Sequence, residues 1–164
     1  MSGTVRLRPP SKELNPRVIG WWRVHTALTF GIPVLVLVVL GVWLSGARFW
    51  LLLPAVVLAV IGLPFTVLMP LWWYRVHRWE VTDTAVYVRT GYFWQEWRVA
   101  PMSRIQTVDT LRGPLQQGFQ LATVTVTTAS SKGPIKIEGL DHELAADLAQ
   151  QLTETTQATP GDAT

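Results

Sequence analysis

The stretch MPLWWYRVHRWEVTD, residues 69–83, changes character along its length, and the interpretation of the whole chain starts from that change. It begins with apolar residues, passes two Trp and one Tyr, and then meets Arg75 and Arg78. Its last part has the composition of a β-strand. This order is expected where a chain leaves lipid and enters water, because aromatic residues settle at the headgroup level and basic residues lie just beyond it.

Two long segments without any charged residue lead up to this stretch, and the second runs into it. Residues 26–44 would form a helix of about 28 Å, which is close to the hydrocarbon thickness of a bilayer. Residues 49–74 are also uncharged and can cross a bilayer with some tilt. Because only residues 45–48 separate the two, the helices must be antiparallel neighbours. The sequence predicts a transmembrane helical hairpin over residues 21–75.

Two alternatives explain these segments without a membrane span. A cleaved signal peptide has a shorter apolar region and is not followed almost at once by a second one. A buried helix of a soluble protein is usually shorter than either segment. Both alternatives are weaker than a transmembrane hairpin.

Aromatic and basic residues gather at the ends of the predicted spans. An indole ring has an apolar body and one N–H donor, so it favours the boundary between lipid and water. The N-terminal flank carries several Arg and Lys residues whereas the link carries only Arg48, so the positive-inside rule places both termini in the cytoplasm. The residues predicted at the membrane interface are Trp21, Trp22, Arg23, Trp43, Trp50, Trp72, Trp73, Tyr74, Arg75 and Arg78.

Residues 76–152 have the pattern of a small α+β domain. Short segments with alternating apolar residues predict six or seven antiparallel strands. In the segment 121–129, for example, Val124 and Val126 are predicted to point inward and Thr123 outward. An amphipathic helix is predicted over residues 141–152, with Asp141 as its N-cap.

The chain ends are predicted to be less ordered than this domain. Residues 1–20 are basic and contain three Pro, so a flexible N-terminal arm is expected there. Residues 153–164 have almost no large apolar side chain, so a disordered tail is expected.

The segment RIQTVDTLRGPLQQGFQLATVTVTTA, residues 104–129, resembles the bacterial PH-like membrane proteins of the YdbS-like family. The resemblance covers residues 20–152 and includes the helical hairpin before the domain. It implies a pleckstrin-homology-like fold of two antiparallel sheets, forming a small barrel or sandwich capped by the C-terminal helix. It also implies a multi-pass protein of the bacterial inner membrane. The turn EVTDTAV (80–86) contains no basic residue, so phosphoinositide binding is not carried over.

No pattern in the sequence predicts a catalytic, cofactor-binding or metal-binding site. The chain has no Cys, and its three His have no metal-ligand spacing. The two spans have no ionisable residue, unlike those of most transporters and pumps. A net charge of +3 gives no argument for nucleic acid, and no small-molecule substrate is indicated. The sequence therefore favours a protein that is not an enzyme.

Four aromatic residues in a single predicted hairpin suggest a contact surface. They are Tyr92, Phe93, Trp94 and Trp97, and they form a candidate patch for a partner or for lipid. The structural alternative is that they fill the small core.

The expected function is that of a membrane-anchored cytoplasmic module. It would bind or scaffold a membrane protein partner or a lipid headgroup, with the bilayer and another membrane protein or a homo-oligomer as partners. The alternative is a small oligomeric membrane component that assists transport or secretion across the inner membrane.

Overall fold

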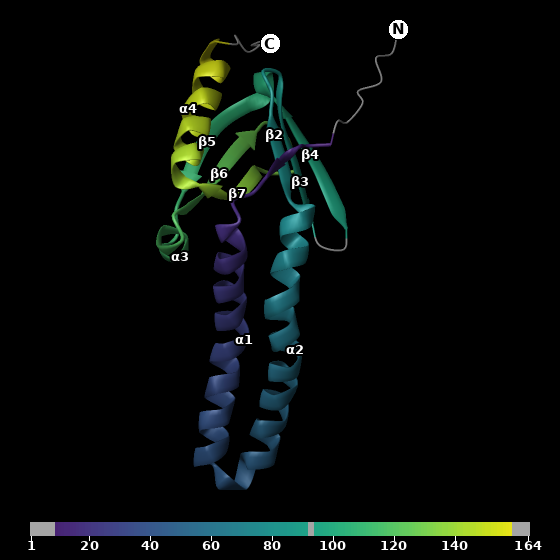
Figure 1. The fold of residues 1–164 in the computed structure, drawn as a ribbon, viewed down its shortest axis with the longest axis vertical. Coiled ribbons are helices and arrows are strands. Elements are labelled where there is room, and N and C mark those ends of the chain that lie inside the picture. The colour runs from purple at the N-terminus through teal and green to yellow at the C-terminus, as the bar shows by residue number, and fades with distance from the viewer. Residues whose placement is uncertain (1–8, 92–93, 159–164) are drawn as a thin grey trace.

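The computed structural model describes residues 9–91 and 94–158 (Figure 1). Two long helices stand side by side, and a β domain with a final helix covers one end of them. The segment before the first helix and the final helix both lie at this domain end. The predicted order of a helical hairpin followed by an α+β domain is confirmed.

The hairpin consists of helix α1 (Arg17–Trp43) and helix α2 (Arg48–Val76), joined by the 3-10 turn Ser45–Ala47. In each helix the most apolar stretch of eighteen residues is only 11% buried. A core helix of a soluble protein would be mostly buried, so this exposure favours contact with lipid. α1 continues through Pro33, and α2 also continues through its three Pro residues.

The two helices approach most closely at glycine residues. A Cβ atom on Gly62 would lie 2.8 Å from Phe30, and one on Gly41 would lie 3.0 Å from Leu52. The rings of Phe30 and Phe65 meet edge to face, with centroids 5.6 Å apart. Helices in lipid gain little from the hydrophobic effect, so close packing at small residues is what holds such a hairpin together.

The described residues of the domain form two antiparallel sheets. The larger sheet has the order β1-β2-β3-β4 and the smaller has the order β5-β6-β7. A short helix, α3 (Pro114–Gly118), joins β5 to β6. The strands are β1 (Lys12–Glu13), β2 (Arg78–Val81), β3 (Ala85–Gly91), β4 (Gln95–Pro101), β5 (Ile105–Leu111), β6 (Leu121–Thr128) and β7 (Ile135–Asp141).

The prediction of a flexible arm over residues 1–20 is wrong for its described part. β1 pairs with the edge of β2, and Asn15 N–H donates to the Gly139 carbonyl at 3.1 Å. α1 then begins at Arg17. The prolines do not prevent this, because a two-residue edge strand needs few ladder bonds and Pro is compatible with the start of a helix. Residues 1–8 lie outside the described residues.

The C-terminal helix α4 (His142–Ala158) is longer than predicted. The disordered tail expected over residues 153–164 is therefore wrong for residues 153–158, while residues 159–164 lie outside the described residues. Threonine hydroxyls in this part donate to the carbonyls four residues earlier, for example Thr153 to Ala149 at 2.7 Å. The Asp141 carboxylate accepts the Glu143 N–H at 3.2 Å, as an N-cap does.

Two strands depart from simple alternation. Thr123 was expected to face outward but is 5% exposed, because Gln116 of α3 covers it and donates to its hydroxyl at 2.9 Å. In β5 the register shifts between Ile105 and Thr107. After this bulge the side chain that packs against the core is Val108.

The start of α1 is part of the domain core. Val18 is fully buried and Trp22 is 7% exposed, and both belong to the same apolar cluster as the inner residues of β6, β7 and α4. Gly139 in β7 has φ +74°, and a Cβ atom there would overlap the Val18 side chain. The membrane hairpin and the domain therefore share one packed junction.

This junction predicts different outcomes for two glycine substitutions. Gly133 also has a positive φ, +77°, but a Cβ atom there would meet nothing within 4 Å. Gly133→Ala should therefore lower the free energy of unfolding by about 1–2 kcal/mol, which is the backbone strain alone. Gly139→Ala should lower it by the same amount and by a further ~1–3 kcal/mol, because the new methyl group overpacks the core. The midpoint of thermal unfolding in detergent, followed by near-ultraviolet circular dichroism, measures both.

A second substitution separates packing from backbone strain. Val18→Ala should restore part of the loss in the Gly139→Ala background, because it makes room for the new methyl group. Equal losses for the two glycine variants, with no rescue, would contradict the shared junction.

Candidate membrane-facing site

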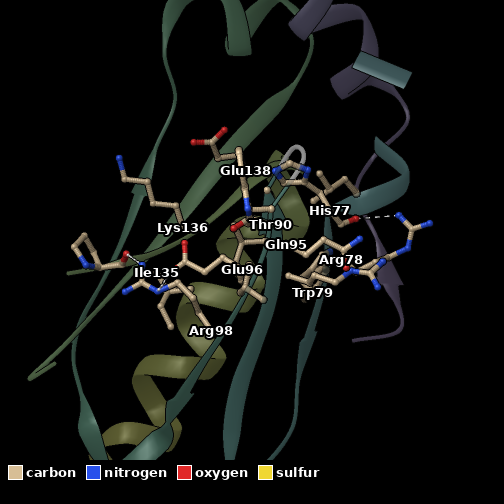
Figure 2. A pocket seen from close by; sticks show the side chains of 17 residues that line it. His77, Arg78, Trp79, Thr90, Gln95, Glu96, Arg98, Ile135, Lys136 and Glu138 are labelled. Atoms are coloured by element: carbon tan, nitrogen blue, oxygen red, sulfur yellow. Dashed lines mark hydrogen bonds and ion pairs between the residues drawn. The ribbon is translucent and has the colours of Figure 1, made fainter. Parts of the chain in front are cut away.

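A cavity of about 680 Å³ opens between the two sheets beside the end of α2 (Figure 2). Its walls come from β2, β3, β4 and β7, and from Leu14 just after β1. His77, the first residue after α2, lines it, as do Gly91 and Trp94 at the β3–β4 hairpin. The cavity therefore lies next to the domain end of α2.

Arg98 ties the two sheets together on one side of this cavity. Its guanidinium donates to the carbonyls of Pro134 at 2.6 Å and Lys132 at 2.8 Å, both in the segment that leads into β7. It also lies 3.8 Å from Glu96, its neighbour on the same face of β4. Successive side chains of a strand point to opposite faces, so Glu96 and Arg98 lie on the same face of β4. Both line the cavity between the sheets.

Two further arginines hold the carbonyl end of α2. Arg78 Nη1 donates to the carbonyls of Tyr74 at 2.7 Å and His77 at 2.9 Å. Arg89 Nε donates to the Val76 carbonyl at 2.9 Å. Cations favour the C-terminal end of a helix, where unpaired carbonyls carry partial negative charge. Arg78 was predicted to lie at the membrane interface, and the structure shows that it caps the carbonyl end of α2.

Glu13 connects the N-terminal segment to the same place. Its carboxylate accepts from Arg78 Nη2 at 2.8 Å and from the Tyr74 hydroxyl at 3.3 Å. Its backbone carbonyl accepts from the Trp79 indole at 3.2 Å. β1 is thereby fixed to both β2 and the end of α2, and nothing in the sequence pattern had marked Glu13.

The predicted interface aromatics separate into two groups. Trp43, Trp50 and Trp72 are 85%, 76% and 52% exposed, so their rings are open to the surrounding solvent or lipid. Trp22 is buried in the domain core, and it meets Trp73 edge to face at 5.6 Å. The expectation of an interfacial anchor is therefore wrong for Trp22, because the helix end packs into the domain rather than standing free.

The other predicted interface residues also have defined places. Trp21, Trp73 and Tyr74 are half-buried and pack against the core cluster. Arg23 and Arg75 are exposed near the domain ends of α1 and α2.

The candidate aromatic patch is only partly described. Tyr92 and Phe93 lie outside the described residues. Trp94 is 87% exposed, and Trp97 is 38% exposed with the Arg89 guanidinium 5.6 Å from its ring centre. Figure 1 shows the β3–β4 hairpin descending beside the last turns of α2. Trp94 directly precedes β4 and lines the same cavity as His77 at the end of α2.

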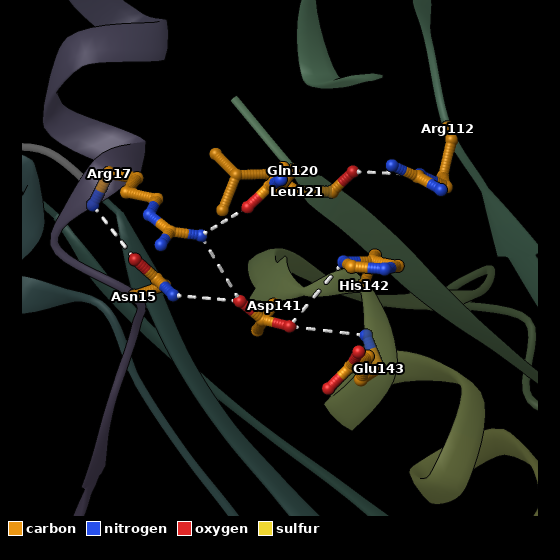
Figure 3. A network of polar contacts seen from close by, with 8 residues as sticks. All are labelled: Asn15, Arg17, Arg112, Gln120, Leu121, Asp141, His142 and Glu143. Carbon is orange, nitrogen blue, oxygen red and sulfur yellow. Dashed lines mark hydrogen bonds and ion pairs between the residues drawn. The ribbon is translucent and has the colours of Figure 1, made fainter. Parts of the chain in front are cut away.

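A second polar network fixes α1 to the domain (Figure 3). Arg17 Nη1 donates to the Gln120 side chain at 3.0 Å and lies 3.5 Å from the Asp141 carboxylate. Asn15 donates to the same carboxylate at 3.4 Å. His142 is half-buried, with Nδ1 3.6 Å from Asp141. The contacts of Asn15 and Arg17 with Asp141 are structural, since they join the start of α1 to the start of α4.

The fold and the site together define a class of protein. Two apolar helices form a membrane anchor, and two antiparallel sheets closed by a C-terminal helix form a PH-like domain packed directly on it. This is a membrane-anchored PH-like protein.

The chain belongs to the bacterial PH domain family, whose profile matches residues 24–156. It is 27% identical to the transmembrane protein YdbS of Bacillus subtilis (strain 168), over 93% of this chain and 97% of YdbS. The predicted resemblance to the YdbS-like family is confirmed, and α1 and α2 are both long and apolar enough to cross a membrane. No solved structure gives a significant match.

His77 at the cavity mouth predicts a pH dependence of stability. Burial lowers the pKa of His77 below its ordinary value of 6.5, although the Trp73 carbonyl, 2.8 Å from Nδ1, and Glu138 act in the opposite direction. The unfolded chain then binds a proton more readily than the folded one. Stability should therefore fall as the pH drops below about 6.5.

The His77→Gln variant isolates this effect. Its unfolding midpoint should depend less on pH in that range than the midpoint of the wild type. Superimposable pH profiles for the wild type and His77→Gln would show that His77 does not cause the dependence.

Proposed function

We propose that the chain is a multi-pass protein of the bacterial inner membrane that holds a non-catalytic PH-like module against the cytoplasmic leaflet. The module binds or scaffolds a ligand at the membrane surface, either a lipid headgroup or another membrane protein. Neither the family description nor the name of the relative includes an enzymatic activity, and this supports a binding role.

The observation that carries this proposal is the absence of a linker between α2 and the domain. α2 ends at Val76 and β2 begins at Arg78. The cavity mouth at His77 and the exposed Trp94 are therefore held close to the depth of the headgroups. A domain so placed meets membrane ligands without first diffusing to the surface, which raises the effective concentration of those ligands.

The basic residues around the junction support a cytoplasmic orientation. Arg23 and Arg75 are exposed near the domain ends of α1 and α2, and Arg48 lies at the opposite end of the hairpin. Together with Lys12 and Arg17, they make the domain end the more positive end of the hairpin among the residues that the structure describes. Each exposed Arg near an anionic leaflet contributes about 1 kcal/mol to attraction.

The depth of Trp94 tests this proposal. The chain has no native Cys, so a single introduced thiol can be labelled with a nitroxide. In the Trp94→Cys variant, reconstituted into lipid nanodiscs, we expect the label to be relaxed by a lipid-soluble paramagnet such as oxygen. The reason is that an aromatic side chain at this position would rest at the headgroup level.

The matched control is Asp83→Cys in the exposed turn between β2 and β3. β2 leads away from α2, so this label should be relaxed mainly by a water-soluble nickel chelate. If the label at position 94 behaved like the one at position 83, the domain would not rest on the bilayer through this hairpin.

A further inference from the structure

The connection between β5 and β6 packs against the domain end of α1. Phe119, which follows α3, lies directly on this helix, because a Cβ atom on Gly20 would be only 2.9 Å from its ring. Figure 1 shows α3 beside the first turns of α1, on the side opposite α2. The contact with Gly20 therefore fixes α3 at a defined level along the hairpin.

The sequence of α1 sets the depth of this contact. The uncharged segment begins at Thr26, six residues after Gly20, and six residues of helix span about 9 Å. The headgroup region of one leaflet extends about 5–8 Å beyond the hydrocarbon. α3 therefore lies at the outer boundary of the headgroups, where its side chains can touch them.

Arg23 lies below this contact on the same face of α1. Residues three and four apart are neighbours on a helix surface, so Arg23 and Val24 follow Gly20 toward the bilayer. Arg23 is exposed, and within residues 9–91 and 94–158 its guanidinium has no ion pair or hydrogen bond. Arg17, in contrast, is held by Asp141. An unpaired cation thus lies at the level of the headgroups, beneath α3.

The two segments that meet here carry no acidic residue. α1 contains no Asp or Glu, and none occurs between residues 110 and 137. The connection itself carries Arg112, which is exposed and donates from Nε to the Leu121 carbonyl at 3.4 Å. A headgroup beside α1 and α3 therefore meets cations, but these segments supply no carboxylate for an ammonium.

We propose that α3 rests on the cytoplasmic leaflet beside α1, and that Arg23 there binds the phosphate of an anionic phospholipid. A guanidinium holds a phosphate through two parallel N–H···O bonds, and Arg112 adds positive potential from above. Val24, apolar and partly exposed on the same face, adjoins the start of the acyl chains. The inference rests on the proposed function, because the domain end of the hairpin must face that leaflet.

An anionic headgroup suits this surface better than a zwitterionic one. A choline headgroup brings its own cation close to Arg23, so repulsion offsets part of the attraction for the phosphate. A phosphoglycerol headgroup has a net negative charge and no such repulsion. The lipids next to this face of α1 should therefore be enriched in phosphatidylglycerol over phosphatidylcholine.

Quenching by spin-labelled lipids measures this enrichment. A Cβ atom on Gly118 in α3 would meet nothing within 4 Å, so Gly118→Cys accepts a bimane fluorophore without a clash. The full-length protein is placed in phosphatidylcholine nanodiscs that contain a small fraction of either lipid with the same nitroxide-labelled acyl chain. The phosphatidylglycerol probe should associate about fivefold more strongly, the ratio that one Arg at the surface supplies. High salt should weaken this preference.

Arginine substitutions separate this site from the overall charge of the protein. Arg23→Gln should remove most of the preference, and Arg112→Gln should reduce it by less. Arg104→Gln is the matched control, because it removes the same charge from an exposed residue at the other end of β5. A preference that survives Arg23→Gln, or that Arg104→Gln reduces equally, would overturn the proposal.

A second fluorophore position tests whether α3 touches the leaflet at all. Ser130→Cys lies in the exposed β6–β7 turn, and the eight residues of β6 place it about 26 Å from the connection. Both lipid probes should quench position 118 more than position 130. Equal quenching at the two positions would overturn the proposal. If the label at position 94 reports lipid while position 118 is not quenched, only this inference fails, and the proposed function stands.

Discussion

The structure depends on lipid surrounding α1 and α2. Side chains such as Leu35, Val60 and Leu63 are 63–68% exposed, and in water each exposed apolar Å² would cost about 25 cal/mol. A bilayer removes this cost, but it also requires that every backbone polar group be satisfied within the segment, which only helices or closed barrels achieve. The short turn between α1 and α2 then makes them antiparallel and brings both domain ends to the same side of the membrane.

That arrangement explains the junction. The start of α1 contributes Val18 and Trp22 to the domain core, and Arg78 and Arg89 cap the carbonyl end of α2. Side chains of the domain thus replace the water that would otherwise satisfy those carbonyls. Because the helix ends are structural parts of the domain, the cavity and the β3–β4 hairpin have a fixed place relative to the bilayer. We infer that this fixed placement, rather than any catalytic group, is what the fold provides.

The sequence predicted the elements better than their junction. The helical hairpin could be predicted from the length of the two uncharged segments, and the strands from their alternating apolar residues. Both signals are repeated over many residues. β1 has only two residues and so no period, and the β5 bulge shifts the face that alternation predicts. Trp22 and Trp72 look alike in sequence, since both lie at a span end, yet only the packing of the domain decides that Trp22 is buried.

The sidedness of the hairpin tests the central claim most directly. Because the chain has no Cys, Ser45→Cys in the interhelical turn and Ser130→Cys in the β6–β7 turn each introduce one reactive thiol. A membrane-impermeant maleimide is added to intact spheroplasts, before and after permeabilisation. The account predicts labelling at position 45 in intact cells and at position 130 only after permeabilisation. Labelling of both positions in intact cells, or the reverse pattern, would contradict a domain held at the cytoplasmic face by a membrane-spanning hairpin.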